Sequence, residues 1–225
     1  MSANEQGGAE PAQQFGCDAV AVTLGASSDV DACVTLATSI DTLIEQATAS
    51  FQADEAGIAC RAGCNFCCHL RVMVFPHEAI ALFRYLGSRM PKERANVVRK
   101  RVLENATHIA QLAREGRTAT NLQCAFLVEG KCSAYEARPA ACSAYHSLSK
   151  EKCEESYNNG GNLPAGIPVL EALRFVAAAL DNGMEQGLEA LELSATRVEL
   201  HALVAALIRN PALIQRWRSG RELKI

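Results

Sequence analysis

Four cysteines crowd into nine residues near the middle of the chain. They are Cys60, Cys64, Cys67 and Cys68, in the pattern CxxxCxxCC. Thiolates this close would repel one another unless a cation lay between them, and both zinc and iron bind deprotonated cysteine. The CxxC step from Cys64 to Cys67 lets two sulfur atoms reach one metal. Adjacent cysteines are uncommon in a mononuclear site because neighbouring side chains diverge, so the pattern indicates two metal centres or a polynuclear cluster.

A second, looser group of cysteines follows further along the chain. Its members are Cys124, Cys132, Cys142 and Cys153. A tight turn at Glu129–Gly130 would bring the first two of these together. The two groups supply eight thiols, enough for two four-thiolate sites or for one cluster and a spare site. We expect the two groups to converge in the fold. The alternative for the first group is buried free cysteine, which is common in protein cores.

The cysteine spacing and the residues around it resemble a known family. The pattern consists of the seven cysteines from Cys60 to Cys142, with Tyr135, Glu136, Arg138 and Pro139 in order between the last two. It resembles the pattern of the YkgJ-type cysteine-cluster family, a zinc- or iron-chelating domain. The resemblance covers roughly Cys60 to Tyr145. Two positions depart from the family pattern: Ala125 stands where proline is usual and Ser143 where arginine is usual. Neither position is an expected ligand.

The resemblance implies metal binding, with zinc or an iron–sulfur cluster as the cofactor. The flagellin lysine-N-methylases are similar in carrying this cysteine pattern, which keeps open an iron–sulfur-dependent modification enzyme. A zinc-stabilised interaction module is the third possibility. The spacing also matches the CxxxCxΦC motif of radical SAM enzymes, with Phe66 in the aromatic place, but the sequence lacks the strand–helix alternation of a βα barrel. It also lacks a GxGxxG loop, which counts against an autonomous methyltransferase.

Arg138 is the residue most suited to support a negatively charged thiolate centre. It lies between Cys132 and Cys142, and a guanidinium can offset thiolate charge and donate hydrogen bonds to sulfur. We expect Glu136 to hold it in a paired geometry. The alternative is an ordinary surface ion pair, which contributes about 0–1 kcal/mol.

Three histidines are candidate nitrogen ligands, although eight cysteines make them less necessary. His69 follows Cys68 directly, His77 begins an expected helix, and His146 lies near Cys142. We interpret His108 and His201 as ordinary helix residues. Cys17 and Cys33 lie outside both cysteine groups.

Composition sets the class of protein and of partner. The chain has 225 residues, a formal net charge of −3 and only 5% aromatic residues, so nucleic acid is not an expected partner. The basic helix near residues 92–114 also contains Glu93 and Glu104, and we interpret it as a solvated face. We find no secretory signal and no membrane-spanning stretch, and expect a cytoplasmic protein whose cysteines serve metal rather than disulfides.

The apolar periodicity predicts a mostly α fold, with helices packed around an irregular cysteine-rich metal-binding core. We expect residues 1–28 to be a disordered tail and 29–225 a single helical domain, with the metal-binding core at about 58–155. The expected helices cover 29–53, 76–90 and 91–115, then one opened by Pro164–Pro168 and interrupted near Gly183, one capped by Ser194, and a short last one carrying Trp217. Residues 70–75 read as extended, and 124–162 as irregular apart from a turn at 135–142.

Overall fold

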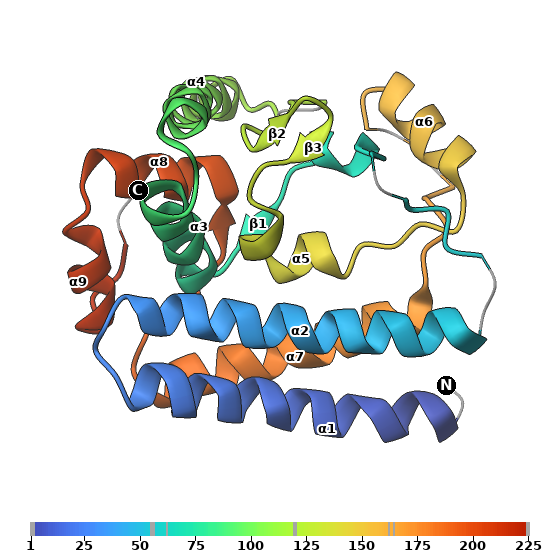
Figure 1. The fold of residues 1–225 in the computed structure, drawn as a ribbon, viewed down its shortest axis with the longest axis horizontal. Coiled ribbons are helices and arrows are strands. Elements are labelled where there is room, and N and C mark those ends of the chain that lie inside the picture. Colours follow the sequence, from blue (N-terminus) through green and yellow to red (C-terminus); the bar gives the residue numbers. More distant parts are fainter. Residues whose placement is uncertain are drawn as a thin grey trace.

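The computed structural model describes residues 3–54, 57–61, 63–118, 121–161, 163 and 165–223. Helices dominate it, which confirms the predicted fold class (Figure 1). The α-helices are α1 (Ala3–Val20), α2 (Asp31–Asp54), α3 (Pro76–Ser88), α4 (Lys92–Arg114), α5 (Ala140–Ser143), α6 (Lys150–Asn158), α7 (Glu171–Ala190), α8 (Leu200–Arg209) and α9 (Leu213–Arg218). A π-helical turn η1 (Ala21–Gly25) follows α1, and 3-10 turns form η2 (Phe66–His69) and η3 (Tyr135–Ala137).

Three long helices, α1, α2 and α7, form a layer along one side of the molecule (Figure 1). The inward face of α2 buries Leu36, Ile40 and Ile44, and that of α7 buries Leu180 and Leu188 among others. These positions recur every three or four residues, so each helix turns one apolar stripe inward. Burying each such side chain stabilises the fold by about 1.5–3 kcal/mol.

The N-terminal segment is helical, so our expectation of a disordered tail over residues 1–28 was wrong. Glycines explain the difference, because they let α1 lie directly against α7. A β-carbon on Gly183 would lie 1.9 Å from the Gln13 carbonyl oxygen, and one on Gly16 would lie 2.6 Å from that of Leu180. Gly16, one of the glycines in the expected tail, is therefore a contact point between helices, and α7 runs through Gly183 without interruption.

On the other side of this layer, α3 and α8 pack together, with α4 against α8 (Figure 1). Two short strands, β1 (Met73–Val74) and β4 (Val198–Glu199), pair antiparallel and join the entrances to α3 and α8. Trp217 of α9 is fully buried. The helices predicted at 76–90 and 91–115 and the last helix are confirmed. The cap of α8 is Glu199 rather than Ser194, and α7 begins at Glu171; Pro164 lies outside the described residues.

The cysteines lie in a region of short elements that we call the cysteine-bearing middle, residues 57–61, 63–72 and 121–161. Strands β2 (Leu127–Val128) and β3 (Lys131–Cys132) form a hairpin whose turn is Glu129–Gly130, as predicted. Both turn residues have positive φ, 52° and 74°, which favours glycine at the second position. Helix α6 was not predicted, because its sequence contains few apolar residues.

Across the described residues, no helix combines the length and the apolar character needed to cross a membrane.

Candidate metal centre

The first cysteine group sits on consecutive tight turns. The Cys64 N–H donates to the Arg61 carbonyl at 2.9 Å, and the Cys68 N–H donates to that of Asn65 at 3.0 Å. Gly63 has φ of 87°, a left-handed conformation that glycine adopts without strain. The turns place the four thiols on one compact stretch of chain, each partly exposed.

Two backbone links bring the second group beside the first. The Cys124 N–H donates to the Cys68 carbonyl at 2.7 Å, which joins the start of the second group to the end of the first. At the other end, the Ala59 N–H donates to the Ser147 carbonyl at 2.8 Å, and the Ser147 N–H points back to the Cys60 sulfur at 3.3 Å. Ser147 carried no signal in the sequence analysis, because nothing in its type or spacing shows that it meets Cys60.

Each of Cys124, Cys132 and Cys142 lies close to Cys67 in the fold. Burial raises the pKa of the Cys142 thiol well above its usual value, and the nearby thiols of Cys124, Cys67 and Cys132 raise it further. Burial likewise raises the pKa of Cys124 to about 11, against the opposing backbone N–H of Phe126. Burial also raises the pKa of Cys132. The backbone N–H of Ala134 opposes this rise, and the thiol of Cys124 adds to it. The thiols of Cys124, Cys132 and Cys142 therefore lie near one another as well as near Cys67.

Cys60 and Cys153 each lie close to both Cys64 and Cys67. Burial raises the pKa of Cys60, the Ser147 N–H opposes it, and the thiols of Cys67, Cys64 and Cys153 add to it. Burial and then the thiols of Cys64 and Cys67 also raise the pKa of Cys153. Cys67 therefore lies near two sets of thiols: Cys124, Cys132 and Cys142 in one, and Cys60, Cys64 and Cys153 in the other. A hydrogen bond with Cys68 and then burial raise its pKa strongly.

The donor chemistry fits zinc or iron, since thiolates are soft ligands that both metals accept. Among the residues that the structure describes, no three Cys, His, Asp or Glu side chains already lie where they could hold one metal ion. The raised pKa values keep six of the metal-free thiols protonated at neutral pH: Cys60, Cys67, Cys124, Cys132, Cys142 and Cys153. Metal binding would therefore have to displace protons and draw the thiols together. The assignment of the eight cysteines as ligands stays a prediction.

Four histidines in or near this region lie in different environments. The His69 Nδ1 lies 3.1 Å from the Asn65 carbonyl oxygen, which fixes the ring and leaves Nε2 unprotonated in the neutral form. His77 is fully buried, and neither ring nitrogen has a hydrogen-bond partner among the described residues. Burial lowers the pKa of His146. His201 is structural, because Nδ1 bonds the Glu199 carboxylate at 2.8 Å and Nε2 accepts the Ala125 N–H at 3.1 Å.

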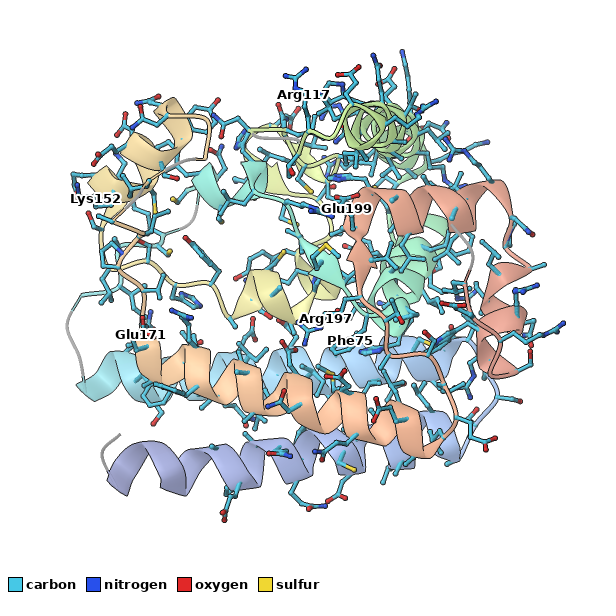
Figure 2. All side chains as sticks on the ribbon, turned by 180° about the vertical axis from the view of Figure 1, so that it is seen from behind. Phe75, Arg117, Lys152, Glu171, Arg197 and Glu199 are labelled. Atoms are coloured by element: carbon cyan, nitrogen blue, oxygen red, sulfur yellow. The ribbon has the colours of Figure 1, made fainter. Side chains whose placement is uncertain are left out.

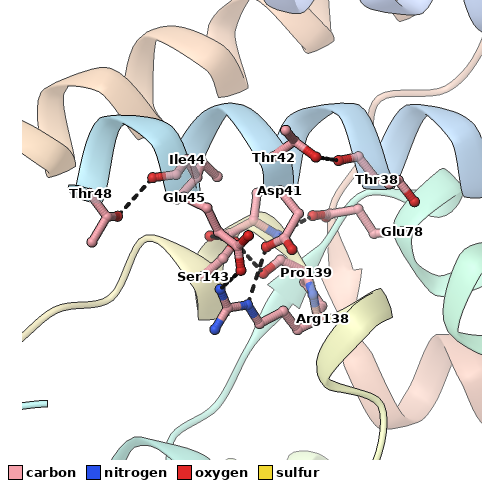
Figure 3. Close-up of polar contacts among 11 residues, drawn as sticks. Thr38, Asp41, Thr42, Ile44, Glu45, Thr48, Glu78, Arg138, Pro139 and Ser143 are labelled. Carbon is pink, nitrogen blue, oxygen red and sulfur yellow. Dashed lines mark hydrogen bonds and ion pairs between the residues drawn. The ribbon is translucent and has the colours of Figure 1, made fainter. Parts of the chain in front are cut away.

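Arg138 joins the cysteine-bearing middle to α2 (Figure 3). Its guanidinium pairs with Asp41 at 3.2 Å and Glu45 at 3.1 Å, and it lies 4.0 Å from the centre of the Tyr135 ring. The expected pairing with Glu136 was therefore wrong. Helix α2 offers two carboxylates one turn apart, and the 3-10 turn η3 aims the guanidinium at them. The cation still acts on the thiols, since it opposes the rise that burial and Cys124 cause in the pKa of Cys132.

A buried carboxylate fixes the short helix that carries Cys142. The two oxygens of Glu78 accept the N–H groups of Phe75 and Ala140, each at 2.8 Å. The first bond closes the N-terminus of α3 and the second that of α5. Burial raises the pKa of Glu78 to about 7, against these two N–H donors. Sequence reasoning missed Glu78, because a glutamate in the first turn of a helix indicates only a local cap.

One comparison with known proteins found a match. Residues 59–159 match the family model described as "Putative zinc- or iron-chelating domain", which confirms the resemblance seen in the cysteine spacing. No curated protein and no solved structure matches the chain.

Proposed function

We propose that residues 59–159, a member of this zinc- or iron-chelating cysteine family, hold zinc or an iron–sulfur cluster through eight cysteine thiolates. The proposed ligands are Cys60, Cys64, Cys67, Cys68, Cys124, Cys132, Cys142 and Cys153. One observation carries the proposal: although 55 residues separate the two groups in sequence, the Cys124 N–H donates to the Cys68 carbonyl at 2.7 Å, so the two groups meet in the fold. The protein would act in metal binding, storage or delivery in the cytoplasm.

The arrangement around Cys67 supports two adjacent sets of ligands. Cys60, Cys64 and Cys153 form one set and Cys124, Cys132 and Cys142 the other, with Cys67 and Cys68 between them. Adjacent cysteines whose side chains diverge can serve one set each. Arg138 would offset part of the negative charge of the set formed by Cys124, Cys132 and Cys142. Its ion pairs with Asp41 and Glu45 reduce this effect.

Anaerobic purification followed by metal and acid-labile sulfide analysis tests this proposal. An iron–sulfur centre gives a brown protein containing iron and sulfide, whereas zinc gives a colourless protein without sulfide. Cys67→Ser should lose the metal, and Cys17→Ser, whose thiol lies on α1 outside both groups, should keep it. Wild-type protein with neither metal, or Cys67→Ser with full metal content, would overturn the proposal.

A second candidate is an iron–sulfur-dependent modification enzyme, as the resemblance to flagellin lysine-N-methylases implies. It is favoured by a groove of about 580 Å³, lined by Tyr145, Ala177 and Ala178 among others, which is large enough for a small molecule. Binding of S-adenosylmethionine to the anaerobically purified protein would support it over simple metal binding. A zinc-stabilised interaction module predicts zinc that stays bound in the presence of competing thiols.

A further inference from the structure

A carboxylate–histidine pair lies buried at the entrance to α8. Glu199 ends β4 and His201 lies in the first turn of α8, and the two residues are only 5% and 6% exposed. Figure 2 labels Glu199 at the point where β4 leads into α8. The family match covers residues 59–159, so both residues lie beyond it in the sequence, whereas the proposed metal ligands all lie within it.

Hydrogen bonds fix the tautomer of His201. Its Nε2 accepts the Ala125 N–H at 3.1 Å, so this nitrogen carries no proton. The proton is on Nδ1, which donates to one Glu199 oxygen at 2.8 Å. The other Glu199 oxygen accepts the Ala202 N–H at 2.8 Å and so caps α8. The carboxylate therefore holds the ring in the one neutral form that can accept a hydrogen bond from Ala125.

The entrance to α8 bonds both of the chain segments that carry cysteines. The Leu200 N–H donates to the Val72 carbonyl at 3.0 Å, on the segment that follows Cys68. His201, the next residue, accepts the N–H of the residue after Cys124. The two segments also bond each other, because the Cys124 N–H donates to the Cys68 carbonyl at 2.7 Å. Three hydrogen bonds therefore fix the two cysteine segments and the entrance to α8 against one another.

The bond from Ala125 to His201 fixes the backbone directly beside a proposed ligand. Ala125 is 1% exposed, and a buried N–H that lacks an acceptor destabilises a fold. The pair also lies close to the thiol itself. Burial raises the pKa of Cys124, the Phe126 N–H opposes this rise, and the Glu199 carboxylate adds to it. The pair is therefore placed to orient Cys124 without binding metal itself.

We infer that His201, held in its tautomer by Glu199, is a positioning residue that fixes Cys124 for metal binding. The inference rests on the proposed function, and it extends the metal centre to residues outside the family match. A thiol that is already held in place has less freedom to lose when metal draws the ligands together. His201 acts on the centre only through the backbone at Ala125.

The first test uses the metal-free, reduced protein, so that it does not depend on metal binding. Iodoacetamide is added, and the rate at which each cysteine is modified is measured by mass spectrometry. His201→Phe removes both ring nitrogens and should speed modification of Cys124 by about tenfold, because loss of a buried hydrogen bond makes local opening easier. Cys60, whose sulfur the Ser147 N–H contacts, should react at the wild-type rate. His108→Phe, at an exposed position on α4, is the matched control and should change neither rate.

Two polar substitutions separate the two bonds of the ring. An asparagine amide reaches about as far as Nδ1, so His201→Asn can keep the bond to Glu199 but loses the bond to Ala125. A glutamine amide reaches about as far as Nε2, so His201→Gln can keep an acceptor for Ala125. Modification of Cys124 should therefore be fast in His201→Asn and close to the wild-type rate in His201→Gln. Equal rates at Cys124 in all variants, or an equal increase at Cys60, would overturn the positioning role.

The second test measures zinc loss from the loaded protein to a chelator, together with urea unfolding of the same variants. His201→Phe and His201→Asn should lose zinc about tenfold faster than the wild type, and His201→Gln at close to the wild-type rate. Lower stability to urea with unchanged zinc loss would show that His201 only supports the fold. Wild-type protein that binds neither zinc nor iron contradicts the proposed function instead, and the first test then still decides whether His201 holds Cys124.

Discussion

The helical framework and the cysteine-bearing middle are held together in different ways. We define the framework as α1–α4 and α7–α9 with the β1–β4 pair and Phe75, which lies between β1 and α3. All of the largest fully buried side chains belong to it. They are Trp217, Phe75, Leu36, Ile44, Ile80, Leu82, Leu86, Leu173, Leu180, Met184, Leu188 and Leu203. The described part of the middle buries mainly alanines, with Phe126 and Leu127 as its largest apolar residues.

This difference indicates that the framework is stable by burial alone, while the middle depends on its ligands. Burial of a leucine stabilises a fold by about 1.5–3 kcal/mol, and an alanine contributes much less. Metal ligation can supply the missing free energy, as it does in small metal-organised domains. Framework side chains bond the middle at several points. Glu78, Arg101, Asn105 and His201 bond its backbone, and Asp41 and Glu45 pair with Arg138.

The largest expected effect comes from removing the thiol that both ligand sets share. Cys67→Ser should reduce metal affinity by more than the roughly 10–100-fold that follows loss of a group that only orients a ligand. Hydrogen exchange should then accelerate in residues 121–161 and remain slow in α2, α3, α7 and α8. Chelation of the wild-type protein should give the same pattern. Unchanged exchange in the middle after metal removal would contradict the dependence on ligands.

A glycine in the framework should give the converse result. Gly183→Ala places a methyl group against the Gln13 carbonyl oxygen and should cost about 2–3 kcal/mol, because α1 must move away from α7. Urea unfolding measures the loss, and metal content should not change. Gly87→Ala in α3 is the matched control. Its new methyl group would lie 3.8 Å from Arg99 Nη2, so it should stabilise by about 0.5–1 kcal/mol. Equal effects of the two substitutions would contradict the close packing.

Acid should weaken the framework through His77. Burial lowers the pKa of His77 from 6.5 to about 3. Below pH 6.5 His77 is protonated in the unfolded chain but stays neutral in the folded chain. The free energy of unfolding therefore decreases as the pH drops towards 3. His77→Phe should remove this loss, which is about 2 kcal/mol near pH 5.

Stability curves of wild type and His77→Phe between about pH 7 and pH 4 test this directly. Glu78 titrates in the opposite sense, because its pKa is raised to about 7, but it is present in both proteins and cancels in the comparison. A difference in stability that does not vary with pH would show that His77 is not held neutral by burial.

The smallest expected effect is on the link between the two regions. Arg138→Ala removes hydrogen bonds to Asp41 and Glu45 and should cost about 1–2 kcal/mol. It should also weaken metal retention or shift the potential of a cluster, because a cation near Cys132 is lost. Arg138→Lys should restore only part of both, since an ammonium cannot reproduce the planar fork of arginine. If Arg138→Ala kept the stability, metal content and cluster potential of the wild type, Arg138 would be making only an ordinary surface ion pair.

The sequence predicts the framework better than it predicts the middle. Apolar periodicity placed α2, α3 and α4 within a few residues, because each buries one stripe. It failed for α1, where Gly16 and Gly183 make contacts that composition cannot reveal. In the middle, spacing identified the cysteines and the Glu129–Gly130 turn. It could not identify Ser147, Glu78 or the true partners of Arg138, because those contacts join positions up to 97 residues apart.

Cysteine protection in the metal-loaded protein tests the central claim most directly. The loaded and the chelated proteins are treated with iodoacetamide, and each modified cysteine is located by mass spectrometry. We predict that cysteines of both groups, Cys60–Cys68 and Cys124–Cys153, are protected together by metal and react together after its removal, while Cys17 does not respond. Protection confined to one of the two groups would contradict a shared centre.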